Sequence, residues 1–127
     1  MAVIGLGAIG SFYGGKLKQA GVHLSVFPRS DYDHVKKYGV KITSIWGDFQ
    51  YKPDDVYASI ESACDTDLHY DYILVCTKVY PDIKLGDWIR PLVSKTTSIV
   101  LIQNGIFIEK DVKKAFPDNE LISVLAF

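Results

Sequence analysis

The first residues of the chain contain the pattern that most restricts its fold. An apolar run, Met1–Ile4, is followed at once by Gly5, Gly7 and Gly10, spaced as GxGxxG. In a strand–turn–helix, the first glycine permits a tight turn and the second lets a ligand approach the backbone. The third lets the helix pack closely on the sheet. The N–H groups at the start of that helix would then face an anionic ligand. The alternative is a turn that needs glycine for steric reasons only.

Two further glycines, Gly14 and Gly15, fall inside the helix predicted over Ala8–Ala20. Each costs about 1 kcal/mol relative to alanine in a helix interior, so they indicate close packing of the helix backbone. Together with the strand–turn–helix context, they favour a dinucleotide-binding turn over a purely steric one. The residues predicted to bind the dinucleotide here are Gly5, Leu6, Gly7, Ala8, Ile9 and Gly10.

Apolar runs alternate with helix-like segments along the rest of the chain, as in parallel sheets buried on both faces. The predicted strands are Met1–Ile4, His23–Phe27, Val40–Thr43, Tyr72–Cys76, Ile99–Ile102 and Leu121–Phe127. The predicted helices are Ala8–Ala20, Tyr32–Tyr38, Ile83–Val93 and Phe107–Phe116. The alternation predicts an α/β fold, a doubly wound parallel sheet of Rossmann-like type with strand order 3-2-1-4-5-6.

The middle of the chain departs from this alternation. Gly47-Asp48 is a turn signal that predicts a small hairpin from the third strand into Phe49–Lys52. The acidic segment Pro53–Asp71 has no regular pattern, and we assign it no element.

Composition excludes several classes of function. The chain has 127 residues, enough for one domain, and a formal net charge of -1, which gives no electrostatic reason to expect nucleic acid or an anionic membrane. The longest uncharged run, Met1–Gly15, is too short and too rich in glycine to cross a bilayer. Cys64 and Cys76 lack both a CxxC spacing and neighbouring histidines, so we expect free thiols and no metal. These features predict a cytoplasmic protein.

The residues after the second predicted strand bear on which dinucleotide is bound. A site for NAD places Asp or Glu there to hold the ribose 2′-hydroxyl, but here Pro28, Arg29 and Ser30 come before the first acid, Asp31. A guanidinium can bind a 2′-phosphate through two hydrogen bonds, and the Ser30 hydroxyl can add a third. The alternative is that Arg29 is a solvated loop charge. Its position in the fold favours NADP(H).

Polar residues also follow the fourth and fifth predicted strands. Lys78 comes after "YILVC" and Asn104 comes after "IVLI". Ligands of open α/β sheets bind beyond the carboxyl ends of the strands, so we expect Lys78 to meet a phosphate or an anionic substrate. Asn104 would hydrogen-bond the cofactor or the substrate. The alternatives are a solvated lysine and an ordinary Asn-Gly turn.

Taken together, these elements resemble the ketopantoate reductase (2-dehydropantoate 2-reductase) family. The matching stretches are "VIGLGAIGSFYGGKL", "FPRS", "VCTKVY" and "IQNGI", in the order and spacing of the family's N-terminal domain. The resemblance implies an oxidoreductase that uses NADPH to reduce 2-dehydropantoate to pantoate, a step towards pantothenate and coenzyme A. By matching position, Gly5, Gly7 and Gly10 would hold the diphosphate and Arg29 the 2′-phosphate. Lys78 and Asn104 would lie on the cofactor at the substrate crevice.

Members of that family continue into a helical second domain, which supplies a proton-donating lysine and a substrate-orienting glutamate. The resemblance therefore implies that residues 1–127 are a dinucleotide-binding domain without its helical partner, and that this chain holds no catalytic residue. Its histidines, His23, His34 and His69, are predicted to be structural or solvated. We expect the chain alone to bind NADP(H) weakly and to be inactive. The full-length protein could form a homodimer.

Two alternatives stay open from the sequence. The first is a reductase of another small 2-keto acid that has the same nucleotide-binding half. The second is an NADP-binding Rossmann domain that carries out no chemistry, which would need only the glycine turn and Arg29. The presence of Lys78 and Asn104 at neighbouring strand ends favours an enzyme with a small-molecule substrate.

Overall fold

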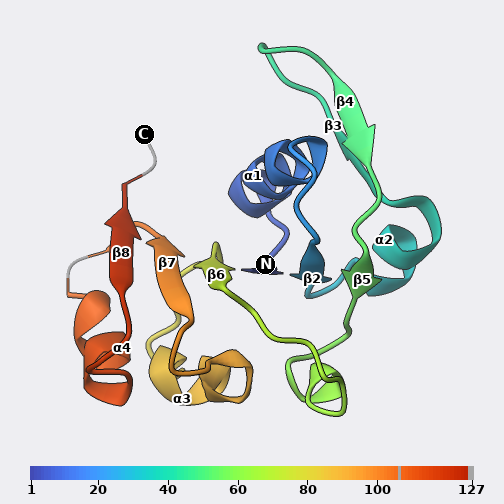
Figure 1. Ribbon diagram of the computed structural model, residues 1–127. Coiled ribbons are helices and arrows are strands. Elements are labelled where there is room, and N and C mark those ends of the chain that lie inside the picture. Colours follow the sequence, from blue (N-terminus) through green and yellow to red (C-terminus); the bar gives the residue numbers. More distant parts are fainter. Residues whose placement is uncertain (106, 126–127) are drawn as a thin grey trace.

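The computed structural model describes residues 1–105 and 107–125, and its centre is a six-stranded sheet (Figure 1). The strand order is β5-β2-β1-β6-β7-β8, and every neighbouring pair is parallel. The strands of this sheet are β1 (Ala2–Ile4), β2 (Ser25–Phe27), β5 (Asp55–Val56), β6 (Tyr72–Val75), β7 (Ser98–Ile102) and β8 (Leu121–Val124). The predicted α/β class and doubly wound, Rossmann-like sheet are confirmed.

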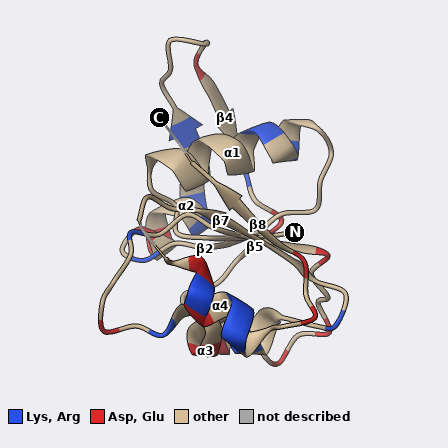
Figure 2. Ribbon diagram, turned by 90° about the vertical axis from the view of Figure 1, so that its left-hand side faces the viewer, with Lys and Arg blue, Asp and Glu red and all other residues tan. Residues whose placement is uncertain are grey.

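Helices cover both faces of the sheet. The helix α1 (Ala8–Gln19) lies on one face, and α3 (Leu85–Ile89) and α4 (Glu109–Ala115) lie on the other (Figure 1). The remaining elements are α2 (Tyr32–Tyr38), the 3₁₀ turns η1 (Glu61–Ala63) and η2 (Arg90–Leu92), and the antiparallel hairpin of β3 (Val40–Ile42) and β4 (Phe49–Tyr51). Both acidic residues of α4 lie in its first turn and two lysines lie in its last turn, so the surface of this helix carries both signs of charge (Figure 2).

The alternation of side chains in β1 shows why a short apolar run holds the centre of the sheet. Ala2 and Ile4 point into the core beneath α3 and α4, whereas Val3 points into the core beneath α1 and the hairpin. All three side chains are 0–1% exposed. Because successive residues of a strand face opposite ways, a central strand between two helical layers must be apolar at every position. Fully burying one aliphatic side chain contributes about 1.5–3 kcal/mol.

The prediction of the third sheet strand was wrong. Val40–Thr43 does not enter the sheet; its first three residues form β3, which pairs with β4 through the predicted turn at Gly47. The place beside β2 is taken by β5, in which Asp55 pairs with Ser25. The pattern of β3 explains this. Exposed Lys41 alternates with partly buried neighbours, which suits a hairpin packed on one side.

Two predicted helices are shorter than expected. The segment Ile83–Val93 contains α3, which begins only at Leu85 and gives way to the 3₁₀ turn η2 at Arg90. Pro91 in that turn has no N–H with which to continue an α-helix. The segment Phe107–Phe116 contains α4, which begins at Glu109. Phe107 has a φ of 63°, which no helical residue adopts.

The other two predicted helices agree closely with α1 and α2. The last predicted strand ends at Val124 rather than Phe127. The final two residues of that prediction lie outside the described part of the chain.

Gly14 and Gly15 allow the hairpin to pack on α1, as their cost in a helix indicated. A Cβ on Gly15 would lie 2.5 Å from Cε2 of Phe49 and 2.7 Å from Cε1 of Tyr51. The hydroxyl of Tyr51 also donates a hydrogen bond of 2.9 Å to the carbonyl oxygen of Ser11. Burial raises the pKa of this hydroxyl, so it stays protonated as a donor. The hairpin is therefore fixed to α1 by its own aromatic residues.

Candidate functional site

The glycine turn lies between β1 and α1, and two of its glycines are required by the protein's own packing. Gly5 has a φ of 89°, and a Cβ there would lie 2.6 Å from Cγ2 of Thr77. A Cβ on Gly10 would collide with the carbonyl oxygen of Gly5 and lie 3.1 Å from Cβ of Cys76. These two positions have a steric reason for glycine that needs no ligand.

Gly7 differs from both of them. Its φ is -70°, which any residue can adopt, and a Cβ built on it would meet no atom within 4 Å. Nothing in the described fold therefore requires glycine at this position. The space is open where the mechanism of a dinucleotide-binding turn needs the backbone to be approached from outside.

The first turn of α1 presents unused N–H groups at this open space. Gly7 is the N-cap, and the first helical hydrogen bond runs from the N–H of Ser11 to the carbonyl of Gly7, at 2.9 Å. The N–H groups before Ser11 have no partner within the helix. The first turn contains no acidic residue, and Lys16 and Lys18 lie in the last turn. The amino end of this 12-residue helix thus keeps its partial positive charge.

A groove of about 600 Å³ runs between this turn and the hairpin. Leu6, Gly7, Ala8 and Ile9 line one side, and Lys41 and Trp46 are among the residues that line the other. The predicted backbone contacts therefore lie together at an accessible surface.

The end of β2 borders a second cavity, of about 220 Å³, which we call the Arg29 cavity. Gly5, Phe27, Arg29, Ile60, Thr77 and Tyr80 are among its lining residues. Nη1 of Arg29 donates a hydrogen bond of 2.7 Å to the hydroxyl of Tyr80. The hydroxyl of Ser30 donates a long hydrogen bond of 3.3 Å to Oδ1 of Asp31. Arg29 is thus held at a cavity beside the glycine turn.

The ends of β6 and β7 border a third cavity, of about 330 Å³, which we call the Lys78 cavity. Gln103 joins these two strand ends, because its Nε2 donates to the carbonyl oxygen of Thr77 at 2.8 Å and to Oγ1 of the same residue at 3.1 Å. Lys78 lies at this cavity and is exposed. Asn104 is exposed too, but it lines none of the three hollows.

The sequence alone assigned no role to the residues that join these features, although Tyr80 could be expected to reach the crevice. Thr77, Tyr80 and Trp88 line both the Arg29 cavity and the Lys78 cavity, so the two lie side by side along the carboxyl ends of the strands. Gln103 is only 6% exposed although it is polar. Its place directly after a buried strand was the available signal, since a buried polar residue needs partners.

The histidines lie apart from these cavities. Nε2 of His23 is 2.7 Å from Oδ2 of Asp55, Nε2 of His69 is 3.0 Å from Oγ of Ser94, and the ring of His34 lies 5.1 Å from that of Tyr38. None of the three lines the groove or either cavity.

Cys64 and Cys76 are free thiols, and burial raises the pKa of the Cys76 thiol to about 12, which leaves it unreactive. Within residues 1–105 and 107–125, no three His, Cys, Asp or Glu side chains gather to hold a metal ion. No helix in the same residues has the length and apolar character to cross a membrane.

Comparison with known proteins agrees with this architecture. The family model described as ketopantoate reductase PanE/ApbA matches residues 1–127. A 2-dehydropantoate 2-reductase of Nostoc is 28% identical over 99% of this chain, and an uncharacterized protein of Saccharomyces cerevisiae is 37% identical over 91% of it. The crystal structure of 2-dehydropantoate 2-reductase from Methylococcus capsulatus has a TM-score of 0.88 and 46% identity over 99% of this chain.

The chain is much shorter than these proteins. It covers 38% of the Nostoc reductase, 37% of the yeast protein and 40% of the Methylococcus chain. Because the family model spans every residue and the fold agrees with that of a solved member, the assignment rests on the whole chain. The chain belongs to the ketopantoate reductase PanE/ApbA family, of which it matches the N-terminal domain.

Proposed function

We propose that this chain is the nucleotide-binding domain of an NADPH-dependent 2-dehydropantoate 2-reductase, which reduces the ketone of 2-dehydropantoate to the alcohol of pantoate. The observation that carries the proposal is the open space at Gly7, where the fold itself has no need of glycine. The names of the Nostoc and Methylococcus relatives supply the substrate. In this proposal residues 1–127 form one domain, and the substrate is bound between it and a second domain.

The residues of the glycine turn fit a dinucleotide. The N–H groups in the first turn of α1 would bind the diphosphate, with Leu6, Gly7, Ala8 and Ile9 alongside it. Arg29 would bind the ribose 2′-phosphate, and Ser30 would turn its hydroxyl from Asp31 to the same phosphate.

Lys78 and Asn104 would face the nicotinamide end of the cofactor and the substrate. The cofactor supplies the hydride when it is bound. A proton must also reach the ketone oxygen, and we assign that step to the second domain. Lys78 would attract the carboxylate of a 2-keto acid, and Gln103 would keep the ends of β6 and β7 at a fixed separation through its hydrogen bonds to Thr77.

The cofactor assignment is tested by titrating the chain with NADP⁺ and NAD⁺. Replacing Arg29 with Ala should weaken NADP⁺ binding by roughly tenfold or more and NAD⁺ binding by less than about twofold, because only NADP⁺ has the phosphate that the guanidinium binds. Arg90→Ala is the matched control, since Arg90 lies 3.2 Å from Asp87 and lines neither the groove nor either cavity. Equal losses for both nucleotides in Arg29→Ala would contradict the assignment.

The substrate assignment is tested with the full-length protein. Its rate of NADPH oxidation should be highest with 2-dehydropantoate among a set of 2-keto acids that includes pyruvate and 2-oxoisovalerate. A clear preference for another acid would assign the same domain to a different reductase.

A further inference from the structure

The guanidinium of Arg29 is hydrogen-bonded to a neutral phenol rather than to a carboxylate. Its only hydrogen bond within the described residues is the one to the hydroxyl of Tyr80. The ion pairs of those residues are Lys18–Asp54, His23–Asp55 and Arg90–Asp87, so no carboxylate neutralises Arg29 there. The guanidinium is held in place by a neutral group and keeps its full charge.

The contact crosses the cavity between two strand ends. Arg29 follows β2, whereas Tyr80 lies 51 residues later, in the loop after β6. Tyr80 is partly buried and lines both the Arg29 cavity and the Lys78 cavity. Cζ of Arg29 lies 5.2 Å from the centroid of the Tyr80 ring. Tyr80, in the loop after β6, thus holds the side chain of Arg29, which is otherwise exposed.

A phenol suits this role better than a carboxylate would. Arginine has five N–H donors in a rigid plane, and the contact with Tyr80 uses one Nη1 donor, so four are left for an anion. A carboxylate in the same place would occupy two donors and cancel the charge that attracts phosphate. Arginine also loses much rotamer entropy when a ligand fixes it, and a side chain already held by Tyr80 has less to lose.

We propose that Tyr80 is a positioning residue that holds Arg29 for the 2′-phosphate and thereby sets the preference for NADP(H) over NAD(H). This inference rests on the proposed function, because it concerns the same phosphate. It assigns part of the cofactor preference to a residue outside the loop that follows β2.

The test is Tyr80→Phe, which removes the hydroxyl and keeps the ring that lines both cavities. We expect the affinity for NADP⁺ to fall about fivefold, as for the loss of one hydrogen bond, and the affinity for NAD⁺ to change by less than about twofold. The same selective loss should appear with 2′,5′-ADP against 5′-AMP, two probes without a nicotinamide. Calorimetric titration measures all four affinities, and a thermal melt checks that the variant is folded.

Tyr32→Phe is the matched control. The hydroxyl of Tyr32 also accepts a hydrogen bond from a cation, Nζ of Lys36 at 2.8 Å, but Tyr32 lines none of the three hollows. This control should leave the ratio of NADP⁺ to NAD⁺ affinity unchanged. In the Arg29→Ala background, Tyr80→Phe should no longer alter that ratio, because the group it positions is gone.

Three results would overturn the inference. The ratio could stay at its wild-type value in Tyr80→Phe, both affinities could fall equally, or NADP⁺ could bind more tightly because Tyr80 competes with the phosphate. If Arg29→Ala still weakens NADP⁺ binding selectively in these cases, the proposed function stands and only the role of Tyr80 falls. If the wild-type chain shows no preference for NADP⁺, or Arg29→Ala affects both nucleotides equally, the cofactor assignment falls and the role of Tyr80 falls with it.

Discussion

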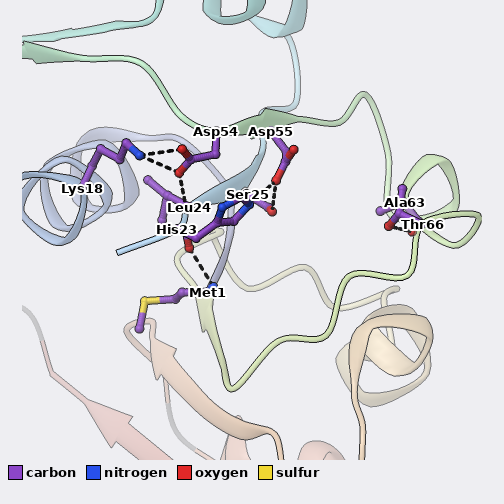
Figure 3. A network of polar contacts seen from close by, with 9 residues as sticks. All are labelled: Met1, Lys18, His23, Leu24, Ser25, Asp54, Asp55, Ala63 and Thr66. Carbon is purple, nitrogen blue, oxygen red and sulfur yellow. Dashed lines mark hydrogen bonds and ion pairs between the residues drawn. The ribbon is translucent and has the colours of Figure 1, made fainter. Parts of the chain in front are cut away.

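The two edges of the central sheet use polar residues in opposite ways. At the amino edge, where the parallel strands begin, charged groups are bound to one another and to the backbone (Figure 3). At the carboxyl edge, where the strands end, Arg29, Lys78 and Lys84 form no ion pair within the described residues. The chain has a net charge of only -1, so this contrast arises from placement rather than from composition.

The amino edge is a closed network around the start of β5. Nζ of Lys18 lies 2.6 Å from Oδ1 of Asp54, whose other oxygen accepts a hydrogen bond of 2.7 Å from the N–H of Leu24. Asp55 accepts a hydrogen bond from the Ser25 hydroxyl at 2.9 Å and lies 2.7 Å from His23. The contacts shown in Figure 3 join α1 to the segments at β2 and β5, two strands that also pair in the sheet. Their partners are all within the chain, so their role is to hold the fold.

The carboxyl edge belongs to the same sheet, but its polar groups are open to a ligand. Backbone N–H groups at α1, the guanidinium of Arg29 and the ammonium of Lys78 border hollows, and neither cation forms an ion pair within the described residues. In an open α/β sheet the ligand binds at this edge. The difference teaches that a charged side chain without a counter-charge in its own chain is the better candidate for binding a ligand.

The largest expected effect comes from Gly7→Val at the carboxyl edge. Because a Cβ at Gly7 meets nothing, the variant should melt at the wild-type temperature and yet lose nucleotide binding by more than roughly 100-fold, as a side chain fills the space of the diphosphate. Titration and thermal melts measure both properties. Gly10→Val is the contrasting variant, and it should unfold because its side chain collides with Gly5. Nucleotide binding retained in Gly7→Val would show that the nucleotide does not bind at this turn.

A smaller effect, on stability rather than on binding, is expected from Asp54→Ala at the amino edge. The change leaves the N–H of Leu24 and the ammonium of Lys18 without their acceptor, so the free energy of unfolding should fall by about 1–2 kcal/mol. Nucleotide affinity should stay within about twofold of wild type. Urea denaturation gives the first value and titration the second. A loss of affinity with unchanged stability would show that the two edges are not separate in role.

Lys78→Met should weaken binding without a change in stability. Lys78 has no partner among the described residues, so the free energy of unfolding should move by less than about 0.5 kcal/mol. The affinity for NADP(H) should fall by about fivefold through the loss of one point charge near an anion. Lys95→Met, another exposed lysine outside the three hollows, serves as the control. Destabilisation by Lys78→Met would mean that Lys78 stabilises the folded chain.

The smallest effect is a pH dependence that arises from Asp54 at the amino edge. Burial raises the pKa of Asp54, but the hydrogen bonds from Lys18 and Leu24 and the charge of Lys18 outweigh it, so the pKa lies below its ordinary value of 3.8. A depressed pKa gives stability that is present above 3.8 and is lost as the pH falls through the lower, folded value. Urea midpoints of wild type should therefore drop more between pH 5 and pH 3 than those of Asp54→Asn. Parallel curves for the two proteins would exclude this contribution.

The sequence predicts the carboxyl edge better than the rest of the molecule. The glycine turn, the helix after it and the positions of Arg29 and Lys78 follow from patterns within short stretches of chain. Residues Asp55 and Val56 could not be predicted as a strand, because a two-residue strand is defined by its partner β2 and has no periodicity of its own. The hydrogen bond from Arg29 to Tyr80 was hidden for a related reason, since it joins residues 51 positions apart.

The partner of the Gln103 side chain could not be predicted either. Its neighbours in sequence mark a turn, but its amide is fixed by Thr77 at the end of another strand. Gly14 and Gly15 show the intermediate case: their cost in a helix predicted a close approach, whereas the rings of the hairpin that approach them emerged only from the structure.

The proposed diphosphate contact at α1 would be made by peptide groups, and this would have an evolutionary consequence. Peptide groups do not titrate, and most substitutions leave them in place. Binding of the diphosphate, which both dinucleotides share, would therefore persist while the surrounding sequence changes. Identity of the coenzyme would instead depend on two replaceable side chains, Arg29 and Tyr80, in separate loops. A lineage could exchange one coenzyme for the other by single-codon steps in those loops, while the ancestral turn of the main chain passed down unaltered.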